Sequence, residues 1–238
     1  MAKDRMQVVI LCGGKGTRMG SGDLPKAMFP IGGRPILWHI MNIYSRQGFS
    51  DFILCLGYKG NKIKDYFSRK KNWRIQFVNT GLETNTGGRL KKAQDYIERS
   101  LFFATYGDGL ADIKLNQLLD FHKAHKKVAT LTAVRPLSPF GIVGISSSNI
   151  VTHFEEKPRL DHWINGGFFV FEKEVFQYLR GHDILEKDTF ARIVKDNNLA
   201  AYRHNGFWEC MDTYKDNLRL NELWEKGIAP WAIWKKGQ

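Results

Sequence analysis

Short hydrophobic runs alternate with amphipathic segments along the first half of this 238-residue chain. The runs have the length and the apolar content of buried strands, and the segments between them carry apolar residues at helical spacing. This alternation predicts an α/β protein with a mostly parallel sheet flanked by helices, and ligands of such sheets gather at the carboxyl ends of the strands. We expect strands at 8–11, 51–57, 75–79, 101–106 and 128–134, and helices at 35–47, 60–67, 87–97 and 115–125.

The second half of the chain has a more mixed pattern. Segments 140–145 and 150–155 look like a pair of strands around a Ser-Ser-Ser-Asn turn, which would form a small β excursion. We also expect a strand at 163–171 and helices at 175–179 and 188–196. No repeat, low-complexity tract or linker divides the sequence, so one domain over 1–238 is the prediction.

The first strand runs directly into a basic, glycine-rich loop, LCGGKGTRMGSGDLPK, over residues 11–26. Glycine permits positive φ and close approach of backbone N–H groups to an anion, so the loop is predicted to bind a polyphosphate. It lacks the Lys-Ser/Thr pair of a P-loop and the last glycine of a GxGxxG dinucleotide loop. A structural glycine-rich turn is the alternative. The candidate residues are Leu11, Gly13, Gly14, Gly16, Thr17, Arg18 and Lys26.

Two aspartates are candidate metal ligands. Asp108 follows a hydrophobic strand and has a glycine on either side, so its carboxylate can approach a ligand without crowding. Magnesium prefers such oxygen ligands and shares them with phosphates. Asp212 follows an apolar aromatic segment. The structural alternatives are an Asp turn for Asp108 and the N-cap of a helix from Thr213 onward for Asp212.

Three further segments carry groups suited to a sugar phosphate or a base. Glu156 and Lys157 supply a carboxylate for hydroxyls and an ammonium for a phosphate, and Asn165 and Gly166 supply an amide beside accessible backbone. Each is weak alone, since a charged strand end is usually solvated and Asn-Gly is usually a turn. In segment 84–89, backbone N–H groups and the Arg89 guanidinium would contact the edge of a base, and a simple helix start is an equally good interpretation. The candidate residues there are Thr86, Gly88 and Arg89.

Composition excludes several classes of protein. The hydrophobic fraction of 43% and the charged fraction of 25% are those of a globular protein, and no long apolar run indicates a membrane span. The net charge of +12 comes from dispersed residues rather than a basic tract, so we expect a basic surface that attracts anionic small molecules, and no nucleic-acid partner. The three scattered cysteines and the polar N-terminus predict a cytoplasmic protein.

Together the motifs occur in the order seen in sugar-1-phosphate nucleotidyltransferases: GGKGTR at 13–18, PK at 25–26, GD at 107–108, EKP at 156–158, NG at 165–166 and Asp212. Longer stretches resemble the glucose-1-phosphate cytidylyltransferases within that family, namely IGGRPILWHIM at 31–41, TGGRLK at 86–91, TYGDG at 105–109, INGGFF at 164–169 and LWEKG at 223–227. The resemblance covers almost the whole chain.

The resemblance implies a Rossmann-like core of the nucleotide-diphospho-sugar transferase fold, with CTP and glucose 1-phosphate as substrates and CDP-glucose and pyrophosphate as products. It implies Mg²⁺ as cofactor and a role in polysaccharide biosynthesis. It is compatible with a homo-oligomer but does not fix the oligomeric state. Carried over to matching positions, it assigns catalysis to Arg18, Lys26 and Asp108, and the metal to Asp108 and Asp212. It assigns the nucleotide to the glycine loop, Lys26, Thr86, Gly88, Arg89 and Asp108, and the sugar phosphate to Gly109, Glu156, Lys157, Asn165 and Gly166.

The implied chemistry is an in-line attack by a sugar-phosphate oxygen on the α-phosphate of CTP, for which charge neutralisation and positioning matter more than a base. Alternatives remain at this point. The same fold would serve UTP or dTTP, or CTP with another phosphorylated acceptor. A non-catalytic nucleotide-sugar binding protein would keep the loop but need no metal pair, and a nucleic-acid module would show binding that weakens steeply with salt.

Overall fold

The computed structural model describes residues 6–16 and 24–235 of the chain. A central sheet of seven strands has the order β12-β8-β11-β6-β1-β4-β5. All neighbouring strands pair in parallel except β11, which is antiparallel to both of its neighbours. The predicted mixed, mostly parallel sheet is therefore confirmed. The strands are β1 (Gln7–Leu11), β4 (Asp51–Leu56), β5 (Arg74–Asn79), β6 (Leu101–Tyr106), β8 (Ala129–Val134), β11 (Ile164–Glu172) and β12 (Leu199–His204).

Helices cover both faces of this sheet, which explains why the central strands are apolar at most positions. In β1, Val8 and Ile10 join one core cluster, and Val9 and Leu11 join the cluster on the opposite face. The first cluster is closed by α1 (Ile36–Ser45), α2 (Gly60–Phe67), α4 (Leu115–His125) and α6 (Tyr214–Glu225). The second is closed by α3 (Thr86–Lys92), η5 (Lys173–Gln177), η6 (Leu185–Thr189) and α5 (Phe190–Lys195).

A short antiparallel pair beside the main sheet brings distant parts of the chain together. Strand β7 (Gly109–Ala111) pairs with β13 (Trp208–Cys210), and the Met211 amide donates to the Asp108 carbonyl over 2.9 Å. As a result, the segment after β6 lies against the segment before α6. Other small elements are η3 (Lys26–Met28), the hairpin of β2 (Pro30–Ile31) and β3 (Arg34–Pro35), η4 (Gln94–Tyr96) and η7 (Ile233–Lys235).

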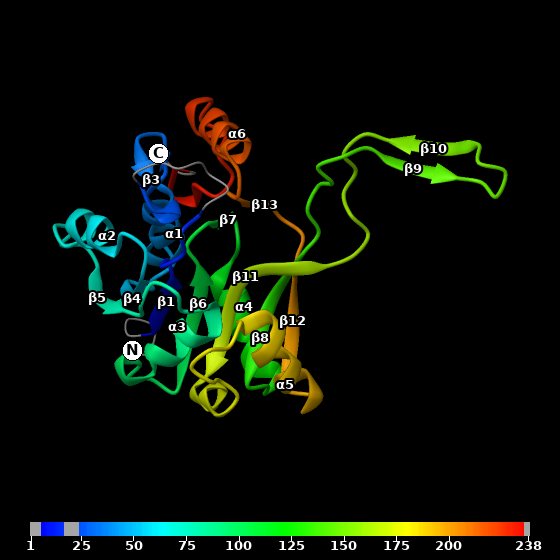
Figure 1. Cartoon of the computed structure of the whole chain (residues 1–238). Helices are drawn as coiled ribbons and strands as arrows, with labels where there is room; N and C mark the ends of the chain where they lie inside the picture. The colour runs from blue at the N-terminus through cyan, green and yellow to red at the C-terminus, as the bar shows by residue number, and fades with distance from the viewer. Residues whose placement is uncertain (1–5, 17–23, 236–238) are drawn as a thin grey trace.

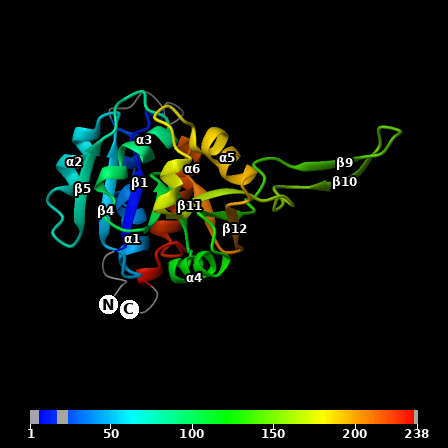
Figure 2. The ribbon, with the colours of Figure 1, turned by 90° about the horizontal axis from the view of Figure 1, so that it is seen from below.

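Strands β9 (Ile142–Ile145) and β10 (Val151–Glu155) form a hairpin that projects from the body of the molecule, as Figures 1 and 2 show. We call this hairpin the arm. Its register places Val143, Ile145, Val151 and Phe154 on one face and Ile142, Gly144, His153 and Glu155 on the other. The first face is wholly apolar and exposed, with Phe154 63% accessible. The predicted β excursion is thus a separate, extended element.

Several boundaries differ from the prediction. The helix expected at 87–97 ends at Lys92 and is followed by the 3₁₀ turn η4, and the helix expected at 175–179 is the 3₁₀ helix η5. Helix α6 begins with Thr213 as its N-cap, in a capping box with Asp216. Asp212 is therefore not the N-cap, and the structural alternative for this residue is wrong. None of the helices in the described part is long and apolar enough to cross a membrane.

Candidate active site

Lys26, Asp108 and Asp212 meet at the carboxyl ends of the central strands. The Lys26 ammonium lies 2.6 Å from Asp108 Oδ2 and also donates to Asp212 Oδ1. Lys26 begins η3 after the glycine loop, Asp108 follows β6, and Asp212 follows β13. Strands β1 and β6 are neighbours in register, so the loop after one and the aspartate after the other share an edge of the sheet.

Attraction between the Lys26 ammonium and the two carboxylates holds this cluster together. Burial lowers the pKa of Lys26, but the neighbouring carboxylates of Asp108 and Asp212 outweigh it and hold the pKa above its ordinary value. The side chain of Lys26 is 16% exposed, against 24% for Asp108 and 46% for Asp212. The ammonium is therefore a permanent cation at neutral pH, placed where anionic oxygens converge.

The residues present fit a divalent metal ion. Ligand atoms of Asp108, Cys210 and Asp212 all lie within 4.8 Å of one another, and the Lys26 ammonium shows that one cation can contact both carboxylates. Burial, followed by the charge of Asp108, raises the pKa of the Cys210 thiol, so sulfur stays protonated and is a poor ligand there. The two remaining oxygen donors suit a hard ion that keeps further positions for phosphate and water.

The three glycines of the loop that the structure describes differ in their surroundings. Gly14 is exposed, and a Cβ atom there would meet nothing within 4 Å. Gly16 has φ of +66° and packs against Lys26, whose Cβ would lie 2.6 Å from a Cβ at that position. Gly16 thus needs glycine for both conformation and space. Leu11 is buried at the end of β1, and Lys15 pairs with Glu83 at 2.6 Å. Thr17 and Arg18 lie outside the described residues.

Gly13 and Arg89 form one unit. The buried Arg89 guanidinium donates to the Gly13 carbonyl over 3.0 Å, and a Cβ at Gly13 would lie 2.2 Å from Arg89 Nη1. The sequence assigned Arg89 to the base, and that role stays a prediction. In the structure, the Arg89 guanidinium donates to backbone carbonyls and to one hydroxyl, so it holds segments of backbone together.

Thr86 and Gly88 contact the loop 180–186, which lies over α3. Gly88 N donates to the Asp183 carbonyl, and Thr86 Oγ1 donates to Glu186 Oε2 over 3.0 Å. A Cβ at Gly88 would lie 2.3 Å from the Gly181 carbonyl oxygen. Both residues therefore pack α3 against this loop, and their predicted contact with the nucleotide stays a prediction.

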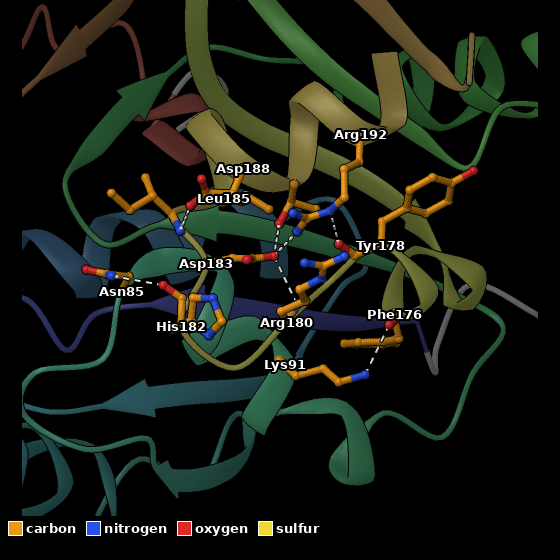
Figure 3. Close-up of polar contacts among 12 residues, drawn as sticks. Asn85, Lys91, Phe176, Tyr178, Arg180, His182, Asp183, Leu185, Asp188 and Arg192 are labelled. Carbon is orange, nitrogen blue, oxygen red and sulfur yellow. Dashed lines mark hydrogen bonds and ion pairs between the residues drawn. The ribbon is translucent and has the colours of Figure 1, made fainter. Parts of the chain in front are cut away.

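Asp183 is the centre of the polar network that shapes the same loop (Figure 3). Its carboxylate accepts from the Arg180 amide, the Thr189 hydroxyl and the Arg192 guanidinium. Burial raises the pKa of Asp183, but these three donors outweigh it and hold the pKa below the ordinary value. On the α3 side, Asn85 donates to the His182 carbonyl over 3.1 Å.

The predicted sugar-phosphate residues fall into two groups. Gly109 and Gly166 are neighbours, with 3.9 Å between a Cβ at Gly109 and the Gly166 carbonyl, and the Trp208 indole donates to that carbonyl over 2.7 Å. Asn165 lies beside them, 3.5 Å from the Tyr106 hydroxyl. The second group stands on the connection from the arm to β11, where Glu156 and Lys157 pair with each other at 3.1 Å and are more than half exposed.

Sequence reasoning did not single out Tyr106, Glu186, Trp208 or Cys210. The Tyr106 hydroxyl donates to Glu186, and burial, with the charge of Glu186, raises the pKa of the phenol. The sequence indicated Trp208 only weakly, because this residue lies in the aromatic segment before Asp212. Glu186 had no signal, because only the packing of the 180–186 loop on α3 brings it near β6.

Comparison with known proteins agrees with this geometry. The nucleotidyl transferase family profile matches residues 7–226. A probable glucose-1-phosphate cytidylyltransferase of Bacillus subtilis is 43% identical, over 96% of this chain and 100% of that protein, and the glucose-1-phosphate cytidylyltransferase of Salmonella typhi is 42% identical, over 97% and 100%. The crystal structure of HddC from Yersinia pseudotuberculosis superposes with a TM-score of 0.75, at 25% identity, over 92% of this chain and 100% of that one. The chain therefore belongs to the nucleotidyl transferase family.

Proposed function

We propose that the protein transfers a cytidylyl group from CTP to glucose 1-phosphate, giving CDP-glucose and pyrophosphate. The observation that carries this proposal is the cluster of Lys26, Asp108 and Asp212 beside the glycine loop. The choice of base and sugar is supported by relatives of that name that are 42–43% identical over almost the whole chain.

In the proposed reaction, an oxygen of the sugar phosphate attacks the α-phosphorus of CTP in line with the bond to the leaving pyrophosphate. A new P–O bond forms as the bond to the β-phosphate oxygen breaks, and no covalent enzyme intermediate arises. The attacking oxygen is already anionic at neutral pH, so no strong general base is needed. The barrier lies in bringing two polyanions together, and the enzyme lowers it by charge and by positioning.

Each group of residues then has a role. Lys26 would neutralise phosphate charge, and the N–H groups of the glycine loop would hold the triphosphate. Asp108 and Asp212 would hold Mg²⁺, which when bound screens the repulsion between the two substrates. Asn165 and Gly166 would hold the sugar beside Gly109, and the ammonium of Lys157 would meet its phosphate. Arg18 would add a further positive charge at the triphosphate.

Pyrophosphate release is the direct test. The purified protein is incubated with Mg²⁺ and glucose 1-phosphate, with CTP, UTP, dTTP, ATP and GTP compared in parallel, and a reaction without sugar phosphate as control. Release with CTP alone supports the proposal. Equal release with UTP or dTTP contradicts the choice of base, and silence with all five nucleotides contradicts the reaction with this sugar.

A further inference from the structure

The Arg89 guanidinium joins three backbone segments that are distant in sequence. It donates to Gly13 at the start of the glycine loop, to Leu56 at the end of β4 and to the segment 80–82. The donor–acceptor distances are 3.3 Å to the Leu56 carbonyl, 2.6 Å to Thr80 Oγ1, 2.8 Å to the Gly81 carbonyl, 3.0 Å to the Gly13 carbonyl and 3.1 Å to the Leu82 carbonyl.

This arrangement uses the fork of the guanidinium rather than its charge alone. Arg89 is 5% exposed, and among the described residues no carboxylate forms an ion pair with it; Glu83, which acts on it electrostatically, pairs with Lys15. All its acceptors are neutral oxygens spread around a plane. A lysine ammonium at the end of a flexible stem cannot reach such a set at once.

Two glycines leave the space that the Arg89 guanidinium occupies. A Cβ at Gly13 would lie 2.2 Å from Arg89 Nη1, and a Cβ at Gly57 would lie 2.5 Å from the same atom. Gly13 has no positive φ, so its lack of a side chain serves the guanidinium here. The entry to the glycine loop is thus built around Arg89.

The hydrogen bonds from Arg89 to these backbone segments, which we call the clamp, fix the direction of one amide in the loop. The Gly13 carbonyl accepts from Arg89 and also from the Tyr58 amide over 3.0 Å. In a planar trans peptide the C=O and the following N–H point in opposite directions, so holding the Gly13 carbonyl inward turns the Gly14 N–H outward. Gly14 is exposed, which leaves that donor accessible from the open side of the loop.

We propose that Arg89 is a positioning residue that aims the Gly14 amide at a phosphate of the bound nucleotide. This inference rests on the proposed function of the glycine loop. Arg89 acts through the backbone of Gly13 and does not itself touch the reacting atoms. The ligand it serves is a nucleoside triphosphate, or any polyphosphate that the loop can hold.

The test compares Arg89→Lys with wild type by calorimetric titration of CTP in the absence of sugar phosphate. We expect CTP affinity to fall by about tenfold or more, because the Gly14 donor is no longer held in one direction. The KM for glucose 1-phosphate should stay within about twofold, since its predicted residues lie on β7, on β11 and on the connection from the arm to β11. Arg89→Lys that binds CTP as tightly as wild type overturns the proposal.

A second set of measurements separates positioning from general loss of stability. Lys92→Met is the matched control, because Lys92 donates to the Thr80 carbonyl over 2.9 Å but does not contact Gly13. This variant should keep CTP affinity, and an equal loss in both variants overturns the proposal. In Arg89→Ala, millimolar guanidinium should restore CTP binding, whereas sodium chloride at equal ionic strength should not; rescue by both salts counts against the proposal.

Amide hydrogen exchange tests the clamp without any substrate. The Tyr58 amide should exchange at least tenfold faster in Arg89→Lys than in wild type, and unchanged exchange overturns the inference. If none of the five nucleotides supports pyrophosphate release by the wild-type protein, the proposed function fails while the inference about Arg89 can still be tested. The inference is then judged by exchange and by the affinity for inorganic tripolyphosphate, which should still fall in Arg89→Lys.

Discussion

Lys26 bridges two carboxylates that are more than a hundred positions apart in the sequence, and this contact defines the site at the scale of single residues. We expect Lys26→Met to lower kcat for pyrophosphate release by about 10²-fold or more, because a cation is lost where negative charge accumulates. Lys226→Met is the control, since Lys226 pairs with Glu222 on the surface at 2.5 Å. Near-normal turnover in Lys26→Met would show that this cluster is not the active site.

His122 predicts a pH dependence of stability that is separate from catalysis. It is buried in α4 beside Thr130 at 2.8 Å, and burial, followed by the charges of Lys123 and His125, lowers its pKa from 6.5 to about 4. Below pH 6.5 the unfolded chain binds a proton at this residue that the folded chain does not. Folding stability should therefore be unaffected above that pH and should fall by up to about 3 kcal/mol between pH 6.5 and 4.

Urea unfolding of wild type and His122→Gln at pH 7.5, 6 and 5 checks this prediction. The difference between the two free energies of unfolding isolates His122 from the carboxylates that also titrate in acid. Glu172 faces the ring from β11 at 3.5 Å, and a strong ion pair with protonated His122 would reduce the effect. Parallel curves for the two proteins over this range would contradict the predicted role.

The glycine residues of the loop show what sequence reasoning achieves at this scale. A basic loop after a strand was predictable from glycine content and charge, and the strand-end position of Asp108 placed it at the same edge of the sheet. The reason for Gly13 was not, because it depends on Arg89, which arrives from α3 through the fold. A sequence gives the type of each side chain but not which distant backbone it will bond.

At the scale of elements, the packing of α3 on the loop 180–186 allows a sharp comparison. Gly88→Ala would place a Cβ 2.3 Å from the Gly181 carbonyl oxygen, so we expect a loss of about 3 kcal/mol in the free energy of unfolding. Gly181→Ala is the matched control, since a Cβ there meets nothing within 4 Å and its φ is not positive. It should be neutral or stabilise by about 0.5 kcal/mol. Equal effects on urea unfolding would mean that the close contact is absent.

The elements that were predicted correctly are those whose pattern follows from full burial. Strands β1, β4 and β6 are covered on both faces and read as continuous apolar runs, so their existence was clear. Strand β12 was missed because it is an edge strand, LAAYRH, in which Ala200 is the one buried residue. Strands β7 and β13 are three residues long, and only their pairing with each other makes them strands.

At the scale of the whole molecule, the arm and the core should contribute unequally to stability. Phe154 on the arm is 63% exposed, whereas Phe168 in β11 is fully buried. We expect Phe154→Ser to change the free energy of unfolding by less than about 0.5 kcal/mol, and Phe168→Ala to cost about 3–5 kcal/mol. Urea unfolding of both variants is the measurement. A large loss in Phe154→Ser would show that the apolar face of the arm is covered in solution.

The position of the arm in the topology has a consequence for how this sequence can change over time. Strands β8 and β11 are antiparallel neighbours, so the arm is a long insertion at the turn of what is otherwise a simple hairpin. Leu137 and Arg159 form a bridge at its root, which keeps the two connecting segments together. Insertions or deletions at the turn 146–150, between β9 and β10, lie beyond this bridge and away from Glu156 and Lys157, and they leave the hydrogen bonding of the main sheet intact. The tip of the arm is therefore free to evolve in length, and it is a natural place to graft a foreign peptide.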